Sequence, residues 1–198
     1  MKRHFGRHSS KELPAVDDLQ KELKRERYKR RFRKLLRSTV NALIVVAAVA
    51  ALIATLVLPV LQIAGTSMEP NLNDGEIVLL VKTKELETGD LCAFYYSNKI
   101  LIKRVIATPG DYIQIESDGT VYLNGNALDE PYVAQKALGE CDVAFPYQVP
   151  ENCYFVMGDQ RETSIDSRSS VIGCIPEDQL IGKIFCKIWP LSELEFID

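Results

Sequence analysis

The 198-residue sequence contains only two histidines, His4 and His8, and both lie close to the N-terminus. A Ser-His-Asp triad or a histidine-based metal site in the rest of the chain is therefore excluded. No Cys-x-x-Cys pair occurs, which argues against a zinc ribbon, and there is no phosphate-binding glycine loop of the recognised kinds. We expect neither a metal nor a cofactor. A nucleophilic enzyme built from this chain needs a base other than histidine.

Charged residues are absent from Ser38 to Met68. The core of this run, at 39–58, has 20 residues, which as a helix span about 30 Å, the thickness of a bilayer core. A buried helix of a soluble domain is one alternative, but so many apolar residues on all sides do not fit a domain of this size. A cleaved signal peptide is another, but its apolar region is shorter and follows a shorter basic start. We therefore predict an uncleaved transmembrane anchor over residues 38–60.

Charge is divided unevenly between the two sides of the predicted anchor. Residues 1–37 contain 14 Lys/Arg and 5 Asp/Glu, a net charge of +9, whereas residues 38–198 contain 10 and 22, a net charge of −12. Positive charge beside a membrane span is typical of the cytoplasmic side. We therefore predict a single-pass protein of the cell membrane, with a basic cytoplasmic tail at 1–37 and an extracytoplasmic domain at 61–198. The basic cluster at 24–34 is interpreted as a contact for membrane lipid rather than for nucleic acid.

All five cysteines lie in the predicted outer domain. Cys92, inside the apolar run at 91–96, is predicted to be a buried strand residue. Spacing leaves open whether Cys141 pairs with Cys153 or Cys174 with Cys186, and an odd number leaves at least one thiol free in a monomer. The oligomeric state also stays open.

The outer domain contains short apolar or alternating runs separated by turn signals rich in Gly, Asn and Asp. None of it has helical periodicity beyond one or two turns. We therefore predict a mainly β fold, with an antiparallel sheet as the body and a small inserted β subdomain at about residues 111–150. The predicted strands are 76–82, 91–96, 99–107, 112–115, 120–123, 153–157 and 182–188.

Two residues of the outer domain are candidates for nucleophilic chemistry. Ser67 lies in the turn Gly-Thr-Ser-Met-Glu-Pro just after the anchor, which holds it near the membrane surface, although serine is also common in turns for structural reasons. Lys103 interrupts an apolar strand, and strand parity places it on one face with Leu101 and Val105. Desolvation on such a face lowers the pKa of a lysine and makes its amine available as a base. The alternative is an edge-strand lysine whose ammonium reaches water.

Four segments occur in an order that matches one known family. They are SMEPNL at 67–72, GD at 89–90 followed by LCAFY, IKRVIATPGD at 102–111 and GDQRETSIDSR at 158–168. Together they resemble the motifs of bacterial type I signal peptidases, in which threonine is more usual than Asn71 and asparagine more usual than Gln160. The resemblance extends from about residue 59 to about residue 190. Each motif alone is weak, whereas four in order are specific.

The resemblance implies a membrane-anchored serine endopeptidase in which Ser67 attacks the scissile carbonyl and neutral Lys103 takes the proton of its hydroxyl. It implies that Ser164 donates or accepts a hydrogen bond that positions the lysine amine. Some members of the family carry a serine two positions before the nucleophile, where it helps to hold the oxyanion. Gly65 stands at that position here, so the second oxyanion donor stays open.

The resemblance further implies two ion pairs that support the site, Arg104 with Asp159 and Asp166 with Arg168. Strand parity agrees in pointing Arg104 away from Lys103. Ordinary surface ion pairs are the alternative, and such pairs contribute only about 0–1 kcal/mol.

The substrates that the resemblance implies are secretory preproteins, whose signal peptides have small side chains at the first and third positions before the cut. An extended peptide of this kind is expected to lie as an added strand beside the Ser67 and Lys103 segments. The side chains that we expect to line shallow apolar pockets for it, each of which could instead be core, are Leu61, Ile63, Met68, Leu72, Val78 and Ile102.

Two other functions compete with this hypothesis. A self-cleaving repressor uses similar chemistry, but no helix-turn-helix pattern precedes the anchor. A membrane-tethered β domain that only binds a partner requires Ser67, Lys103 and Ser164 to be together by coincidence. The distance between the Ser67 hydroxyl and the Lys103 amine distinguishes an enzyme from such a domain.

Overall fold

The computed structural model describes residues 16–197, except for the side chains of residues 16–18 and 53–57. The first 15 residues of the predicted basic tail lie outside the described part. The chain divides into two compact units, residues 1–52 and residues 53–198. Each unit is described by itself.

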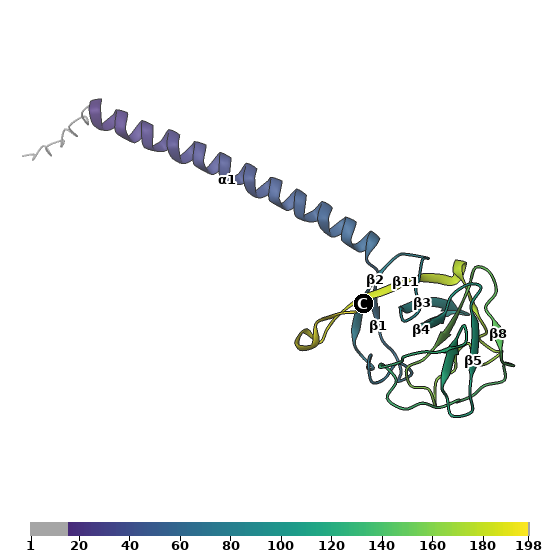
Figure 1. Ribbon diagram of the computed structural model, residues 1–198. Coiled ribbons are helices and arrows are strands. Elements are labelled where there is room, and N and C mark those ends of the chain that lie inside the picture. The colour runs from purple at the N-terminus through teal and green to yellow at the C-terminus, as the bar shows by residue number, and fades with distance from the viewer. Residues whose placement is uncertain (1–15, 198) are drawn as a thin grey trace, which may run out of the picture. The chain divides into compact units, whose positions relative to one another are not determined.

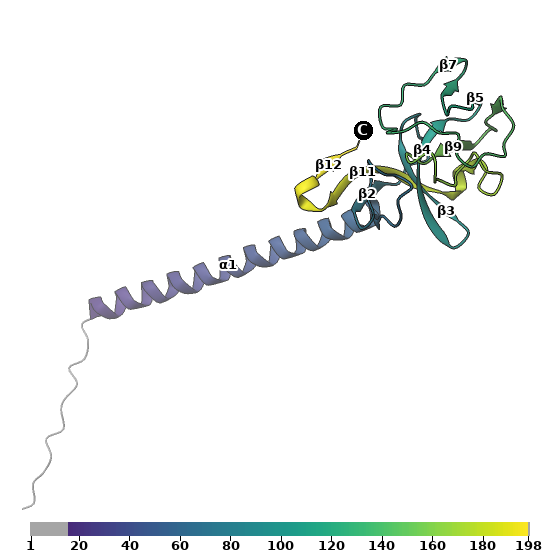
Figure 2. The same ribbon diagram turned by 90° about the horizontal axis from the view of Figure 1, so that it is seen from below.

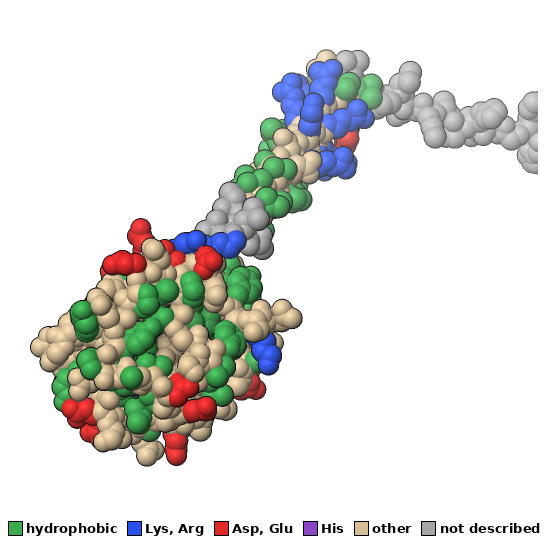
Figure 3. Space-filling view, turned by 90° about the vertical axis from the view of Figure 1, so that its right-hand side faces the viewer, with side chains coloured by type: hydrophobic (Ala, Val, Ile, Leu, Met, Phe, Trp, Pro, Cys, Tyr) green, Lys and Arg blue, Asp and Glu red, His purple; other side chains and the backbone are tan. Residues whose placement is uncertain are grey.

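One long helix, α1 (Val16–Val57), forms the described part of the first unit and continues a few residues beyond it (Figure 1). Its 42 residues correspond to about 63 Å. Basic side chains gather on its N-terminal part and apolar side chains follow them (Figure 3). Among the described residues it is the one helix long and apolar enough to cross a membrane, and apolar side chains such as Leu43 and Leu52 are 63% exposed. A core helix of a soluble protein would bury these side chains.

The second unit is built on an antiparallel sheet of eight strands, which begins three residues after α1 ends. Proline at position 59 cannot continue a helix, and the chain turns into the first strand there. The order across the sheet is β1-β2-β11-β3-β4-β9-β10, and β12 pairs with β11. The hairpin of β3 and β4 extends beyond the rest of the sheet (Figure 2). The strand bounds are β1 (Val60–Gln62), β2 (Ile77–Val81), β3 (Leu91–Tyr96), β4 (Lys99–Ala107), β9 (Cys153–Met157), β10 (Ile175–Pro176), β11 (Leu180–Trp189) and β12 (Glu195–Phe196).

A smaller antiparallel sheet of four strands is inserted between β4 and β9, in the order β7-β6-β5-β8. It packs its apolar face, with Ile113 and Val121 fully buried, against Phe155 and Met157 of β9. A long loop joins β7 to β8 within this smaller sheet. The bounds are β5 (Tyr112–Ile115), β6 (Val121–Leu123), β7 (Asn126–Ala127) and β8 (Tyr147–Gln148).

The predicted fold class, a mainly antiparallel β body preceded by one apolar helix, is confirmed. Each of the seven predicted strands is present, and four of them have the predicted bounds. The strands that the sequence analysis missed have two or three residues each, too few for an alternating pattern to be visible. The only other helices in the described residues are two short 3₁₀ turns, Glu177–Gln179 and Leu191–Glu193.

Candidate active site

Ser67 is held in a compact loop between β1 and β2. The neighbouring Met68 and Leu72 side chains are buried in the core, and the Leu72 N–H donates to the Met68 carbonyl at 2.9 Å. The Ser67 carbonyl accepts a hydrogen bond from the Gln160 N–H at 3.1 Å. Two apolar anchors and one long-range hydrogen bond therefore fix the backbone of Ser67, while its side chain stays half-buried at the edge of the sheet.

Lys103 lies in β4, where its Cα is paired with that of Cys92 in β3. Only 4% of the residue is exposed. Leu101 and Val105, which strand parity places on the same face as Lys103, belong to one apolar cluster with its cross-strand partner Cys92. The reading of Lys103 as an edge lysine that reaches water is therefore wrong. Its Nζ lies 2.7 Å from Ser67 Oγ, within hydrogen-bond distance.

Burial is the main cause that lowers the pKa of Lys103 to about 8. The carboxylates of Asp166 and Asp159 favour the charged amine and oppose this shift, and the nearby Arg168 guanidinium adds to it. A substantial fraction of the amine is therefore neutral in mildly alkaline water. Cys92, fully buried beside it, has its thiol pKa raised to about 12 by burial, so it carries no charge at neutral pH.

Ser164 lies against the same loop, and its hydroxyl is buried without a hydrogen-bond partner among the described residues. The hydroxyl lies close enough to Asp166 to lower the pKa of that carboxyl, but in a geometry that makes no hydrogen bond. The expected hydrogen bond between Ser164 and Lys103 is therefore not formed, and the Lys103 amine contacts the Ser67 hydroxyl. An unpartnered buried hydroxyl is costly, so this group is available for a contact that forms when the site is occupied.

Gly158 lies where the segments of Ser67 and Ser164 are in close contact. A Cβ on Gly158 would lie 2.6 Å from the Ser67 carbonyl oxygen and 2.6 Å from the Ser164 Cβ. Any other residue would push the segment that carries Ser164 away from the segment that carries Ser67. Glycine at this position lets the two candidate residues approach each other.

The first of the expected ion pairs is formed and is buried. Arg104 binds Asp159 through two hydrogen bonds, of 2.8 Å and 2.6 Å, and the side chains are 8% and 0% exposed. Arg104 also donates to the Gly89 carbonyl, and Asp159 accepts a third hydrogen bond from Asn71 Nδ2 at 2.8 Å. Asn71, which stands where the resembling family more often has threonine, therefore helps to satisfy this carboxylate.

The second ion pair is completely buried. Arg168 contacts both carboxylate oxygens of Asp166, at 2.9 Å and 2.8 Å, and neither side chain is exposed. Burial alone would raise the pKa of Asp166, but the hydrogen bonds and charge of Arg168 and the Gly158 N–H lower it overall. The interpretation of these two pairs as surface ion pairs is wrong, since both are inside the protein. They shape the segment from Gly158 to Arg168 that carries Ser164.

An apolar groove of about 370 Å³ runs past the Ser67 hydroxyl and the Lys103 amine. Of the expected pocket residues, Leu61, Ile63, Met68 and Ile102 line it. Leu72 and Val78 do not, and their placement in the pocket is wrong: both are fully buried in the core of the main sheet. An apolar residue with less buried neighbours is compatible with either a pocket or a core, so the sequence did not separate the two.

Gly65 also lines the groove, with a φ of +98° and an N–H that donates to Asp74. Glycine has no side chain, so position 65 supplies no side-chain donor to an oxyanion. The Ser67 N–H makes no hydrogen bond to any described residue, so it is free to donate to a bound group. All five cysteines are free, and the described residues include no cluster of His, Cys, Asp and Glu suited to a metal ion.

The sequence analysis missed a third buried ion pair, between Glu130 of the inserted segment and Arg161. The two side chains meet at 2.6 Å and are both 0% exposed. Arg161 lies within the last of the four motifs but had no assigned role, and Glu130 lies in a loop without periodicity. The sequence Asp129-Glu130-Pro131 gives no signal that singles out a buried partner for Glu130.

A serine hydroxyl against a buried lysine of low pKa, at the edge of an antiparallel sheet, is the arrangement on which hydrolases with a serine nucleophile and a lysine base depend. The sequence matches the family described as signal peptidase, peptidase S26, over residues 36–189. The chain therefore belongs to this family of peptidases. Together with α1, this membership indicates a membrane-anchored protein.

Two individual relatives agree with this family assignment. The chain is 38% identical over 154 residues to signal peptidase IB of Staphylococcus aureus (strain MRSA252), an alignment that covers 68% of this chain and 79% of that protein. It is 35% identical over 152 residues to signal peptidase I of Bacillus licheniformis, covering 69% and 79%. A crystal structure of a signal peptidase I from Enterococcus faecalis V583 is 28% identical, with a TM-score of 0.44, and covers 50% of this chain and 96% of that chain.

Proposed function

We propose that this protein removes signal peptides from exported preproteins, with Ser67 as the nucleophile and Lys103 as the general base. The observation that carries the proposal is the 2.7 Å distance between Ser67 Oγ and the Nζ of a lysine whose pKa burial lowers to about 8. The family match and the relatives named signal peptidase supply the substrate class.

In the proposed reaction, neutral Lys103 takes the hydroxyl proton as Ser67 Oγ attacks the scissile carbonyl. The Ser67 N–H, which has no partner among the described residues, donates to the oxyanion. The protonated amine then gives its proton to the leaving amine of the mature chain, and an ester joins the signal peptide to Ser67. Water hydrolyses this ester with Lys103 again as the base, which restores the free enzyme.

Ser164 is proposed to hold the amine once substrate fills the groove, because its hydroxyl is buried and unpartnered without substrate. The buried pairs Arg104–Asp159 and Asp166–Arg168 are proposed to support the loop that carries it. Leu61, Ile63, Met68 and Ile102 line the groove in which an extended peptide would lie, with room for small side chains near Ser67.

The membrane topology belongs to the same proposal. The basic residues of α1 precede its apolar part, so we infer that the N-terminus is cytoplasmic and that residues 61–198 are outside. The basic part of α1 would contact anionic lipid headgroups. A signal peptide emerging from the bilayer then meets a nucleophile only a few residues from the end of the anchor.

The test is cleavage of one preprotein by the full-length protein in lipid vesicles, with the product identified by mass spectrometry. We expect the wild type to cut after the signal peptide, and Ser67→Ala or Lys103→Ala to lower the rate about 10⁴-fold or more. Matched controls are Ser117→Ala and Lys82→Ala, which are exposed and outside the site and should keep the wild-type rate. A Lys103→Ala enzyme within tenfold of the wild type would refute the dyad. A wild type that binds preproteins without cutting them would favour a binding domain.

A further inference from the structure

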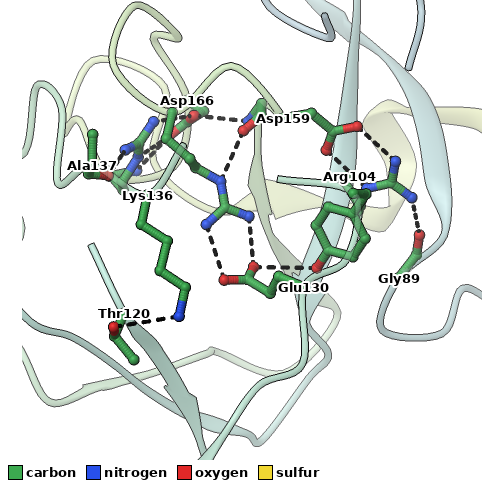
Figure 4. A network of polar contacts seen from close by, with 12 residues as sticks. Gly89, Arg104, Thr120, Glu130, Lys136, Ala137, Asp159 and Asp166 are labelled. Carbon is green, nitrogen blue, oxygen red and sulfur yellow. Dashed lines mark hydrogen bonds and ion pairs between the residues drawn. The ribbon is translucent and has the colours of Figure 1, made fainter. Parts of the chain in front are cut away.

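The Glu130–Arg161 ion pair joins the inserted segment to the candidate site. Arg161 Nη2 donates to Glu130 Oε1 at 2.6 Å and Nη1 donates to Glu130 Oε2 at 3.2 Å, so the contact is bidentate (Figure 4). Both side chains are completely buried. Glu130 lies in the loop after β7, whereas Arg161 follows β9 of the main sheet. The pair therefore connects a loop of the inserted segment with the loop after β9 in the interior of the protein.

A third donor of Arg161 is directed at the loop that packs against the candidate nucleophile. Arg161 Nε donates to the Gly158 carbonyl at 3.0 Å. Gly158 is packed so closely against the Ser67 carbonyl and the Ser164 side chain that no Cβ fits there. Two residues further on, the Gln160 N–H donates to the Ser67 carbonyl at 3.1 Å. A displacement of Arg161 would therefore reach Ser67 through a few directional contacts.

Tyr132 connects the same inserted segment to Arg104, the neighbour of Lys103 in β4. Its hydroxyl donates to Glu130 Oε1 at 3.2 Å, and the centroid of its ring lies 4.0 Å from the guanidinium carbon of Arg104 (Figure 4). Its carbonyl accepts from Asn71 Nδ2 at 2.8 Å. Arg104 is the immediate neighbour of Lys103 in β4. Segment 130–132 thus contacts the supports of both candidate catalytic residues.

We propose that Glu130 is a positioning residue of the peptidase, which acts through Arg161 and Gly158 to hold the segments of Ser67 and Ser164 in register with Lys103. The proposal rests on the proposed peptidase function. A bidentate ion pair fixes both distance and orientation. An apolar pair of the same volume often stabilises a fold equally well, so a contribution to stability alone does not require these charges.

The first test is Glu130→Gln, which keeps the shape of the side chain and removes its charge. We expect kcat to fall roughly 10- to 100-fold while KM changes less than about threefold, since a small misplacement of reacting groups lowers the rate of the chemical step. We also expect the acid limb of the pH–rate profile, where the rate falls as Lys103 becomes protonated, to move to higher pH. A loosened loop admits water to Lys103, and water favours the charged amine and raises its pKa. The groups that face Lys103, namely Asp166, Arg168, Asp159 and Cys92, are unchanged in this variant.

A second readout does not depend on activity. Amide hydrogen exchange at Gln160, whose N–H donates to the Ser67 carbonyl, should become faster in Glu130→Gln. The matched control is Val121→Ala, a fully buried residue of the inserted sheet. It should lower the melting temperature while the Gln160 exchange, the kcat of the folded enzyme and the acid limb stay at their wild-type values.

If Glu130→Gln does not fold, Tyr132→Phe removes only the hydroxyl that binds Glu130 and should show the same changes at smaller size. The proposal is overturned if either variant folds with wild-type kcat, acid limb and Gln160 exchange, or if Val121→Ala changes them equally. A wild type that does not cleave preproteins would refute the peptidase function, and the exchange experiment would still decide whether Glu130 positions the loop.

Discussion

Two buried lysines of the second unit, residues 53–198, differ in what surrounds them. Lys103 in β4 is 4% exposed and Lys187 in β11 is 6% exposed. Lys187 Nζ lies 3.4 Å from Glu76 Oε1 and 3.4 Å from Glu193 Oε2. No described carboxylate forms an ion pair with Lys103, whose nearest polar partner is the Ser67 hydroxyl.

The pKa values of the two amines move in opposite directions. Burial lowers both, but for Lys187 the charges and hydrogen bonds of Glu76 and Glu193 outweigh it and raise the pKa. The Lys187 amine also lies nearer to solvent, since the side chain of its partner Glu193 is 54% exposed. For Lys103 burial dominates, and the pKa falls to about 8. Burial without a paired carboxylate, rather than burial alone, makes a lysine a base at physiological pH.

The largest effect expected from this comparison is the pH dependence of the wild type. The proposed reaction needs neutral Lys103, and below a pKa near 8 the neutral fraction falls about tenfold for each pH unit. We therefore expect kcat/KM for preprotein cleavage to rise about 10²-fold from about pH 6 to about pH 9 and then to level off. A profile that is flat over this range would show that no titrating lysine limits the reaction.

A smaller effect is expected when Lys103 receives the kind of partner that Lys187 has. Cys92 is paired with Lys103 across β3 and β4, so Cys92→Asp places a carboxylate beside the amine. An opposite charge at such a distance raises a lysine pKa by about 1–3 units. We expect the acid limb to move upward accordingly, with kcat/KM at neutral pH lowered about tenfold or more and partly restored in alkaline buffer.

The control for this prediction is Cys92→Asn, which has nearly the same shape as the aspartate and no charge. Its acid limb should stay where the wild-type limb lies, even if its stability falls. Near-UV circular dichroism verifies that both variants are folded. Equal limbs in the Asp and Asn variants would mean that pairing does not control the pKa of Lys103.

The smallest effect on cleavage is expected for Lys187→Met. Removing the cation leaves Glu76 with its hydrogen bonds to Asn73 only, so we expect the free energy of unfolding to fall by roughly 2 kcal/mol. Cleavage per folded molecule should stay within about threefold of the wild type, with the acid limb unchanged. Chemical denaturation measures the first quantity and the rate profile the second. A displaced acid limb would show that the two lysines are coupled.

Much of the fold was predictable because the relevant patterns are local. The charge-free run at 38–60 and the basic residues before it predicted a membrane-spanning helix, and α1 contains most of that run. Alternation of apolar residues predicted the longer strands, including both long strands of the hairpin that carries Lys103. Strands of two or three residues, such as β10 and β12, form because their neighbours are already in place, and no local pattern marks them.

The candidate site was predictable in part. The Ser67 and Lys103 segments were identified from motif order and strand parity, and their contact is observed. The groove was assigned less well, because Leu72 and Val78 have the apolar character of lining residues but lie in the core. Glu130 could not be assigned from its loop, since its role depends on Arg161, which follows it by 31 positions.

The sequence by itself determined the order of the elements, the long apolar helix and the types of side chain available, because hydropathy and turn chemistry act over a few residues. Only the tertiary structure decided which distant groups meet: Ser67 with Lys103 and Glu130 with Arg161. The tertiary structure also decided how far each of these groups is buried from solvent. A pKa and an ion pair depend on the atoms packed around a group in space, and those atoms come from strands and loops that the chain brings together only when it folds.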